Sequence, residues 1–197
     1  IRHQPHDKKE RPDMSTSSKE ILIRRSEITR RVQELADEIS RDYAGGEILM
    51  IGVLKGAFIF MADLVRAMSI SCQTDFIRAA SYGASSESSG NIVITKDVEL
   101  TIEGRDILIV EDIIDTGLTL RHIVDTLKLR NPKSIKVCTF LDKRERRKVP
   151  FEADYVGFTM DEGFIVGYGL DFSEQYRFLP DVYVISNKMD QGKEGDQ

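Results

Sequence analysis

The sequence predicts an α/β fold in which a parallel sheet is flanked by helices on both faces. Short apolar segments alternate with amphipathic ones along most of the 197 residues, which is the pattern of a chain that alternates strands and helices. One segment, residues 107–110, contains only branched apolar residues, as expected of a strand that is buried on both faces. The composition, 41% hydrophobic and 31% charged, is that of a globular protein.

Two helices and three strands are expected before residue 100. The first helix starts at the candidate N-cap Ser26 and keeps apolar residues at helical spacing until Ala44, Gly45 and Gly46 end it. An apolar helix is expected over residues 57–68, after a break that contains Lys55 and Gly56. The strands expected here are residues 47–53, 74–81 and 92–95.

The second half of the chain continues the same alternation. After the buried strand at 107–110, a turn is predicted over residues 111–119. A helix with one apolar face follows from Leu120 and stops before Pro132. Further strands are expected over residues 135–141, 155–158, 164–168 and 182–185.

These elements fit a single domain, because a chain of this length can bury one core. Residues 1–18 are polar and lack the apolar centre of a secretory signal, so we expect a flexible leader before one domain at 19–186. The polar residues 187–197 are expected to form a flexible tail. No run of about 18 apolar residues occurs, so we expect no membrane partner.

Charge and cysteine content narrow the classes of partner. The net charge is −5, with basic and acidic residues mixed along the chain, so nucleic acid is not expected as a partner. Cys72 and Cys138 lie in different apolar segments without the CxxC spacing of a zinc or redox site. This pattern favours buried thiols in a reducing compartment, which we take to be the cytoplasm.

The most informative segment is the turn that follows the buried strand. Asp115, Thr116, Gly117, Leu118 and Thr119 lead directly into a helix, where backbone N–H groups, hydroxyls and the positive helix terminus suit a phosphate dianion. Gly117 lets the backbone approach the ligand closely. The sequence contains neither GxxxxGK[ST] nor a GxGxxG after a strand, which argues against a P-loop nucleotidase and a dinucleotide site.

Glu111 and Asp112 are adjacent acids at the end of a core strand, where they repel each other and any phosphate. The pair suits a ligand that brings hydroxyls and a divalent cation, because a ribose diol donates to carboxylates and Mg²⁺ prefers oxygen ligands. Taken alone, the turn is equally compatible with a helix-capping Asp beside solvated acids.

The segment Val110-Glu-Asp-Ile-Ile-Asp-Thr-Gly-Leu-Thr119 resembles the phosphoribosyl pyrophosphate (PRPP) signature of type I phosphoribosyltransferases, in particular the hypoxanthine-guanine branch. Segments that resemble that family follow the same order over about residues 50–185. They are Val53-Leu-Lys-Gly-Ala-Phe58, Ala80-Ser-Tyr82, Leu141-Asp-Lys-Arg144 and Val166-Gly-Tyr-Gly-Leu-Asp171 through Tyr176-Arg177.

The resemblance implies a type I phosphoribosyltransferase-like parallel sheet with a small hood built from the N- and C-terminal segments. It implies a purine salvage transferase that joins hypoxanthine or guanine to PRPP and gives IMP or GMP and pyrophosphate. Mg²⁺ is the implied cofactor, and the implied assembly is a homo-oligomer, either a dimer or a tetramer.

The resemblance also assigns PRPP and metal contacts. Its PRPP-binding residues are Lys55, Gly56, Glu111, Asp112, Asp115, Thr116, Gly117, Leu118 and Thr119. A cis peptide often precedes the lysine in this family. Glu111, Asp112 and Asp171 are the implied Mg²⁺ contacts. Arg177 completes the pyrophosphate clamp, where a guanidinium fork suits the anion better than a point charge does.

The purine side is assigned in the same way. Asp115 is the implied general base and faces the purine N7. Lys143 is expected to donate to a 6-oxo group and to oppose the 6-amino group of adenine, although it stands in a basic run, 143–148, that alone is typical of solvated surface. Phe164 is expected to stack on the purine, and the carbonyls of Ile165 and Asp171 to accept from a 2-amino group. The candidate catalytic residues are Asp115, Lys143 and Arg177.

Ser81 and Tyr82 begin a Ser- and Gly-rich segment that the resemblance makes a flap over PRPP and composition alone makes a linker. Two alternative functions stay open. The first is an RNA-binding regulator with the same fold, although such relatives typically lack an acid at the position of Asp115. The second is a phosphoribosyltransferase that prefers xanthine, which Lys143 does not exclude.

Overall fold

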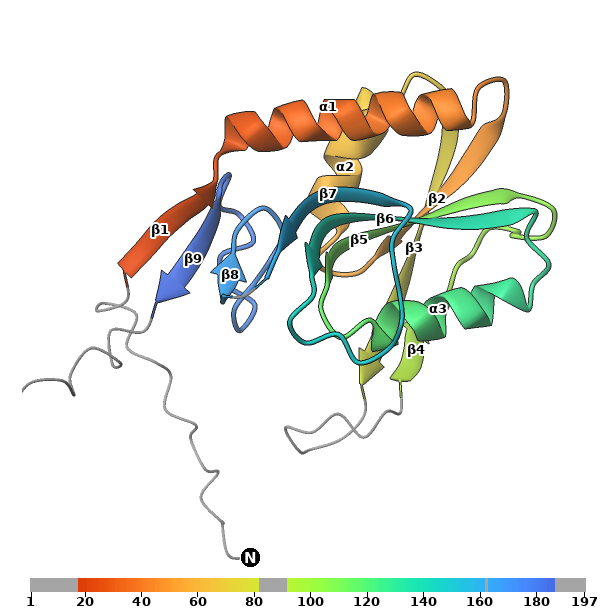
Figure 1. The fold of residues 1–197 in the computed structure, drawn as a ribbon. Coiled ribbons are helices and arrows are strands. Elements are labelled where there is room, and N and C mark those ends of the chain that lie inside the picture. The colour runs from red at the N-terminus through yellow and green to blue at the C-terminus, as the bar shows by residue number, and fades with distance from the viewer. Residues whose placement is uncertain (1–17, 82–91, 162, 187–197) are drawn as a thin grey trace, which may run out of the picture.

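The computed structural model describes residues 18–81, 92–161 and 163–186, and over them it forms a six-stranded sheet of order β4-β3-β2-β5-β6-β7 (Figure 1). Every neighbouring pair is parallel except β3 and β4, which are antiparallel. The predicted α/β class is therefore confirmed. The strands are β2 (Glu47–Val53), β3 (Ser71–Ser81), β4 (Ile92–Lys96), β5 (Asp106–Ile114), β6 (Ser134–Lys143) and β7 (Tyr155–Met160).

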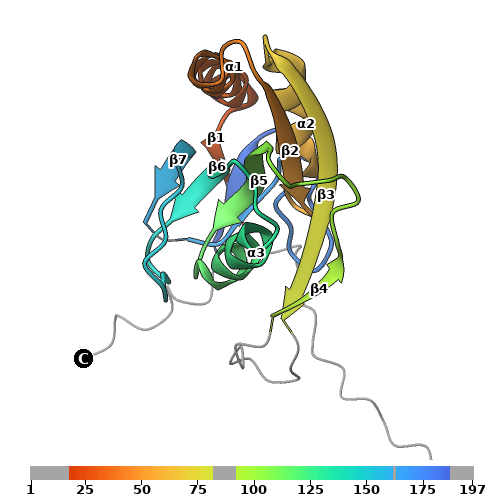
Figure 2. The same cartoon turned by 90° about the vertical axis from the view of Figure 1, so that its right-hand side faces the viewer.

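Helices cover both faces of this sheet, as Figures 1 and 2 show from two directions. The helices are α1 (Arg25–Asp42) and α2 (Phe58–Ala67) on one face and α3 (Leu118–Lys128) on the other. Successive side chains of a strand point to opposite faces. Along β5, Leu108 therefore packs into the core under α1 and α2, while Ile109 packs into the core under α3. This two-sided burial explains the continuous apolar run of the strand.

A second, three-stranded sheet joins the two ends of the described chain. Its order is β1-β9-β8, with β1 (Ser18–Ile23), β9 (Val182–Ser186) and β8 (Ile165–Val166) paired antiparallel. It is the hood that the resemblance implied, and Figure 1 shows it beside the end of the sheet at which β7 terminates. Ligands of open α/β sheets bind outside the carboxyl ends of the strands. Apart from Ser18, the predicted leader and tail lie outside the described residues.

The N-cap prediction at Ser26 was wrong. Helix α1 begins at Arg25, and Arg24 is its N-cap. The reason is a pair of carboxylates that accept the first N–H groups: Glu27 accepts from Arg24 at 3.0 Å, and Asp181 accepts from Arg25 at 2.7 Å. Among the residues that the structure covers, no helix is both long and apolar enough to cross a bilayer.

Two predicted boundaries near the site also differ. β5 does not end at Val110 but continues to Ile114, because its last residues pair with β6, as Ile114 does with Asp142. The acidic pair therefore lies within a strand and not in a turn. The strand predicted over 164–168 contains only Ile165 and Val166, because the positive φ angles of Gly167 (103°) and Tyr168 (51°) turn the chain.

Candidate active site

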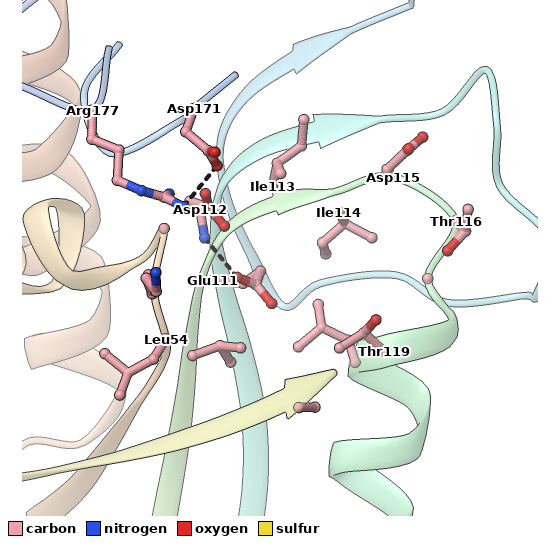
Figure 3. Close-up of a pocket in the computed structure, with 16 residues that line it drawn as sticks. Leu54, Glu111, Asp112, Ile113, Ile114, Asp115, Thr116, Thr119, Asp171 and Arg177 are labelled. Carbon is pink, nitrogen blue, oxygen red and sulfur yellow. Dashed lines mark hydrogen bonds and ion pairs between the residues drawn. The ribbon is translucent and has the colours of Figure 1, made fainter. Parts of the chain in front are cut away.

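A cavity of about 300 Å³ opens where β2 and β5 end (Figure 3). Its lining includes Asp171 and Arg177, and Figure 3 shows this pair on one side of the site and Asp115 with Thr116 on the other. The predicted PRPP residues that line it are Lys55, Gly56, Glu111, Asp112, Asp115, Thr116, Gly117 and Thr119. Leu118 belongs to the same turn but not to the lining of this cavity, as far as the described residues show. The structure thus brings together residues from four separate segments of the chain.

The phosphate turn is shaped by Gly117, which caps α3 with a φ of 78°. This left-handed conformation favours glycine, and a Cβ there would lie 3.1 Å from both Arg147 and Val149. The carbonyl of Thr116 accepts the N–H of Lys148 at 2.9 Å, which holds the turn from outside. Thr116, Gly117 and Thr119 line the cavity, so the start of α3, whose first N–H groups have no acceptor within the helix, lies at the cavity.

The acidic pair lies at the cavity floor, where Glu111 is buried and Asp112 is half-buried. Glu111 is 7% exposed, and its carboxylate accepts the backbone N–H of Asp112 at 3.1 Å. Burial, together with the charge of Asp112, raises the pKa of Glu111 well above its usual value. Burial also raises the pKa of Asp112, although Arg177 acts in the opposite direction. Two adjacent carboxyl groups thus share a site in which their charges oppose each other.

These carboxyl groups fit a divalent cation, because a cation would offset the burial that raises both pKa values and the charge of Asp112 that also raises the pKa of Glu111. The three predicted metal contacts do not form a closed site, however. Within the described ranges, no group of three His, Cys, Asp or Glu side chains could hold a metal ion. Asp171 faces Arg177 instead, at 2.7 Å. Glu111 and Asp112 could hold a cation only together with oxygens of a substrate, and the metal contacts of Glu111, Asp112 and Asp171 all stay predictions.

The turn after β2 touches this floor directly. A Cβ on Gly56 would lie 1.7 Å from an Asp112 carboxylate oxygen, so only glycine leaves room for that side chain. On the other side, a Cβ on Gly169 would lie 2.3 Å from the carbonyl oxygen of Gly56. The peptide between Leu54 and Lys55 is cis, as is common in the family that the sequence resembles. Close backbone packing therefore places Lys55 at the cavity rim.

Ion pairs join this rim to the segment that precedes β9. Lys55 Nζ lies 2.8 Å from a carboxylate oxygen of Glu174, and an Arg177 nitrogen lies 3.7 Å from the same oxygen. Arg177 also donates to the carbonyl of Gly169 at 2.6 Å. The two cations predicted to clamp pyrophosphate are thus neighbours, and one carboxylate bridges them.

Asp115 lies at the opposite end of the cavity. One of its carboxylate oxygens is 3.3 Å from the guanidinium of Arg146. The other, Oδ1, is buried and has no hydrogen-bond partner among the described residues. A buried carboxylate oxygen without a donor is costly unless a ligand supplies one. The predicted general base therefore lines the cavity and carries one oxygen that no described residue satisfies.

Of the predicted purine residues, Asp171 lines this cavity, whereas Lys143, Phe164 and Ile165 do not. Lys143 ends β6 and donates to the carbonyl of Gly163 at 2.9 Å, next to Phe164. Phe164 is 47% exposed and packs edge-on against Phe172, with 5.1 Å between ring centroids. Ile165 is buried in β8. Lys143 and an exposed aromatic face therefore adjoin each other near Asp171. Ser81 ends β3, and Tyr82 with the rest of the predicted flap lies outside the described residues.

Arg147 was missed by the sequence reasoning, which placed it in a solvated basic run. Its side chain is only 17% exposed and donates to the carbonyls of Asp115 (3.0 Å) and Ile114 (3.4 Å). It also pairs with the buried carboxylate of Asp142. Nothing in the run 143–148 distinguishes this arginine from its exposed neighbours, because two of its acceptors, at residues 114 and 115, are distant in the sequence.

Comparisons with known proteins agree with this geometry. The model of the phosphoribosyl transferase domain family matches residues 18–173. The chain is 51% identical over 168 residues to a hypoxanthine-guanine phosphoribosyltransferase of Aquifex aeolicus, covering 85% of this chain and 94% of that one. The corresponding enzyme of Bacillus subtilis is 47% identical over 172 residues, covering 87% and 96%. A crystal structure of a hypoxanthine-guanine phosphoribosyltransferase from Bacillus anthracis superposes with a TM-score of 0.81 at 46% identity, covering 85% and 98%. The chain therefore belongs to the phosphoribosyl transferase domain family, in its hypoxanthine-guanine branch.

Proposed function

We propose that the protein transfers the phosphoribosyl group of PRPP to N9 of hypoxanthine or guanine and releases pyrophosphate. The observation that carries this proposal is one cavity that combines a turn at a helix start, an adjacent acidic pair and two neighbouring cations. The relatives named above support a transferase over the RNA-binding alternative. They also support hypoxanthine and guanine over xanthine as substrates.

Substrate binding follows from the two ends of the cavity. The N–H groups at the start of α3 and the hydroxyls of Thr116 and Thr119 bind the 5-phosphate, aided by the positive helix terminus. Since Leu118 carries no charge, the phosphate affinity of this turn comes from backbone and hydroxyl donors. The carboxylates of Glu111 and Asp112 accept hydrogen bonds from the ribose hydroxyls.

Pyrophosphate departure requires positive charge at the other end. Lys55 and Arg177 bind the pyrophosphate oxygens, and the planar guanidinium can donate to two of them at once. Glu111 and Asp112 would hold Mg²⁺, which, when bound, neutralises developing charge on the leaving group. Removal of the pyrophosphate leaves positive charge on the ribose, as in other glycosidic cleavages.

Asp115 handles the proton of the incoming purine. Its carboxylate, which lines the cavity, accepts the hydrogen of the purine N7, so that electron density at N9 increases as the bond to ribose forms. A positioned acid or base of this kind contributes about 10²–10⁴-fold to rate. Arg147 keeps the backbone of Asp115 in place while the carboxylate acts.

Base selection rests on Lys143. Its ammonium has donors only, so it complements the 6-oxo group of hypoxanthine and guanine and meets the 6-amino group of adenine with a second donor. Phe164 offers its exposed face for stacking. The hydrogen bond between Lys143 and Gly163 orients the ammonium toward the segment that carries this ring.

Incubation with PRPP, Mg²⁺ and each of four purine bases tests the proposal. We expect IMP and GMP to form with equimolar pyrophosphate, and adenine and xanthine to react poorly. Efficient use of xanthine would favour the other transferase specificity. A homo-oligomer and a cytoplasmic location complete the proposal, and light scattering and cell fractionation measure them.

A further inference from the structure

Glu174 makes contacts that the proposed reaction does not use. One of its carboxylate oxygens lies 2.8 Å from Lys55 Nζ and 3.7 Å from an Arg177 nitrogen. These two cations are the groups that bind pyrophosphate in the proposed function. A negatively charged side chain therefore already pairs with the two cations that an anionic ligand would contact.

The backbone conformation around Glu174 positions this carboxylate beside the two cations. Glu174 and Ser173 both have positive φ angles, 64° and 52°, which non-glycine residues adopt only where the surroundings enforce them. The N–H of Glu174 donates to an Asp171 carboxylate oxygen at 2.8 Å. Phe172 and Gln175 exchange two backbone hydrogen bonds, at 3.0 and 3.2 Å. The turn is thus pinned at both ends, and its conformation directs Glu174 toward Lys55.

Stability does not explain this arrangement. The side chains of Lys55 and Glu174 are 48% and 63% exposed, and ion pairs at such positions contribute little to folding. Their electrostatic effect on a ligand is larger, because pyrophosphate carries several negative charges and would approach the same two cations. When pyrophosphate binds, Glu174 therefore either loses its ion pairs with Lys55 and Arg177 or stays beside the ligand and repels it.

We propose that Glu174 is a positioning residue that competes with pyrophosphate for Lys55 and Arg177 and thereby limits how tightly the product is held. The proposal rests on the proposed function, since it requires these cations to bind pyrophosphate. As the product leaves, the carboxylate re-forms both ion pairs and keeps the cations in place for the next PRPP. Product release limits turnover in many enzymes, so a competing carboxylate next to the leaving group favours release.

The test replaces the charge and keeps the size, with Glu174→Gln. In the presence of Mg²⁺ we expect the inhibition constant of pyrophosphate and the KM of PRPP to fall by about tenfold at low salt, the effect of one unit charge near a multiply charged anion. The effect should shrink as ionic strength rises. The kcat should fall, because pyrophosphate leaves more slowly, and the thermal midpoint should stay unchanged.

Glu99→Gln is the matched control, because Glu99 is also an exposed carboxylate that pairs with a lysine, Lys96, at 3.0 Å and does not line the cavity. It changes the net charge equally and should leave pyrophosphate inhibition unchanged. Weaker or unaltered inhibition in Glu174→Gln, or an equal change in both variants, would overturn the inference. Absence of nucleotide formation by the wild-type protein would overturn the proposed function itself, and the two failures are therefore distinguishable.

Discussion

The guanidinium of Arg147 donates to the backbone carbonyl of Asp115 across 3.0 Å, which fixes the residue carrying the candidate base to the loop after β6. The same guanidinium pairs with Asp142, whose exposed fraction is 3%. Asp142 precedes Lys143, the residue proposed to recognise the purine. One buried arginine thus connects the phosphate turn to the purine side of the site.

Replacement of Arg147 by lysine should lower the free energy of unfolding by about 2–4 kcal/mol. A lysine cannot reach several acceptors in different directions, so Asp142 and two carbonyls would lose donors while buried. Urea denaturation measures the loss. Arg121→Lys, on the exposed face of α3, is the control and should change stability by less than about 0.5 kcal/mol. A similarly small change in Arg147→Lys would contradict the connecting role.

The general-base role of Asp115 predicts a separation of binding from turnover. Asp115→Asn should still bind PRPP, because the phosphate donors of the turn are main-chain and hydroxyl groups. Its kcat should fall by about 10²–10⁴-fold, since an amide cannot take the purine proton. Calorimetric titration with PRPP and steady-state kinetics measure the two quantities. The control is Asp125→Asn, because Asp125 is an exposed aspartate of α3, and this variant should behave as wild type. Full turnover in Asp115→Asn would refute the role.

Lys143→Gln should reduce discrimination between bases. A carboxamide can donate to a 6-oxo group and accept from a 6-amino group, whereas an ammonium only donates. We expect the ratio of kcat/KM for hypoxanthine over adenine to fall by about tenfold or more, as a mismatched buried donor costs about 1–3 kcal/mol. Competition between the two bases in one reaction gives this ratio directly. An unchanged ratio would place base selection elsewhere.

Gly56→Ala tests the close packing at the cavity floor. The new methyl would lie 1.7 Å from an Asp112 oxygen, so the carboxylate or the turn has to move. We expect a loss of about 1–3 kcal/mol of stability, typical of overpacking, together with weaker PRPP binding. Gly46→Ala is the control, because its methyl would meet only the carbonyl oxygen of Tyr43, at 3.4 Å. Equal behaviour of the two variants would show that the floor tolerates a shift.

The environment of Asp75 predicts how the free energy of unfolding changes with pH in the acidic range. Its buried carboxylate accepts three backbone N–H groups, from Phe76 (2.6 Å), Glu99 (2.7 Å) and Leu100 (2.8 Å). Burial alone would raise the pKa of Asp75, but these donors outweigh it and hold the pKa below its usual value of 3.8.

Because the pKa of Asp75 is lower in the folded state, its contribution is complete above about pH 4 and is lost as the pH falls through the folded-state value. Asp75→Asn should therefore cost about 2 kcal/mol at neutral pH and progressively less below pH 4. Unfolding curves measured from pH 7 to pH 3 give this difference. A cost that stays constant over that range would contradict the assignment.

Strand–helix alternation and the signature at residues 110–119 were sufficient to predict the α/β class and most of the cavity lining. They were sufficient because strands buried on both faces read as apolar runs and because the phosphate turn is contiguous in the chain. The N-cap at Ser26 failed for a long-range reason, since Asp181 accepts the N–H of Arg25. The prediction that β5 ends at Val110 failed because its pairing with β6 continues through Glu111 and outweighs the low strand preference of acidic residues.

Side-chain roles that depend on distant partners were out of reach. Arg147 and its exposed neighbours look alike in sequence, and only the tertiary structure places one of them beneath the phosphate turn. The same holds for Glu174, because its nearer cation, Lys55, lies on a distant segment of the chain, although Arg177 is only three residues away. Local patterns therefore predicted most of the residues that line the cavity, whereas the contacts that Arg147 and Glu174 make with them became visible only in the fold.

A crystal structure of the protein with PRPP and Mg²⁺ measures the central claim most directly. We expect the 5-phosphate at the N–H groups of residues 115–119, the ribose hydroxyls at Glu111 and Asp112, and the pyrophosphate beside Lys55 and Arg177. Density for PRPP elsewhere, or a 5-phosphate more than hydrogen-bond distance from the start of α3, would contradict it.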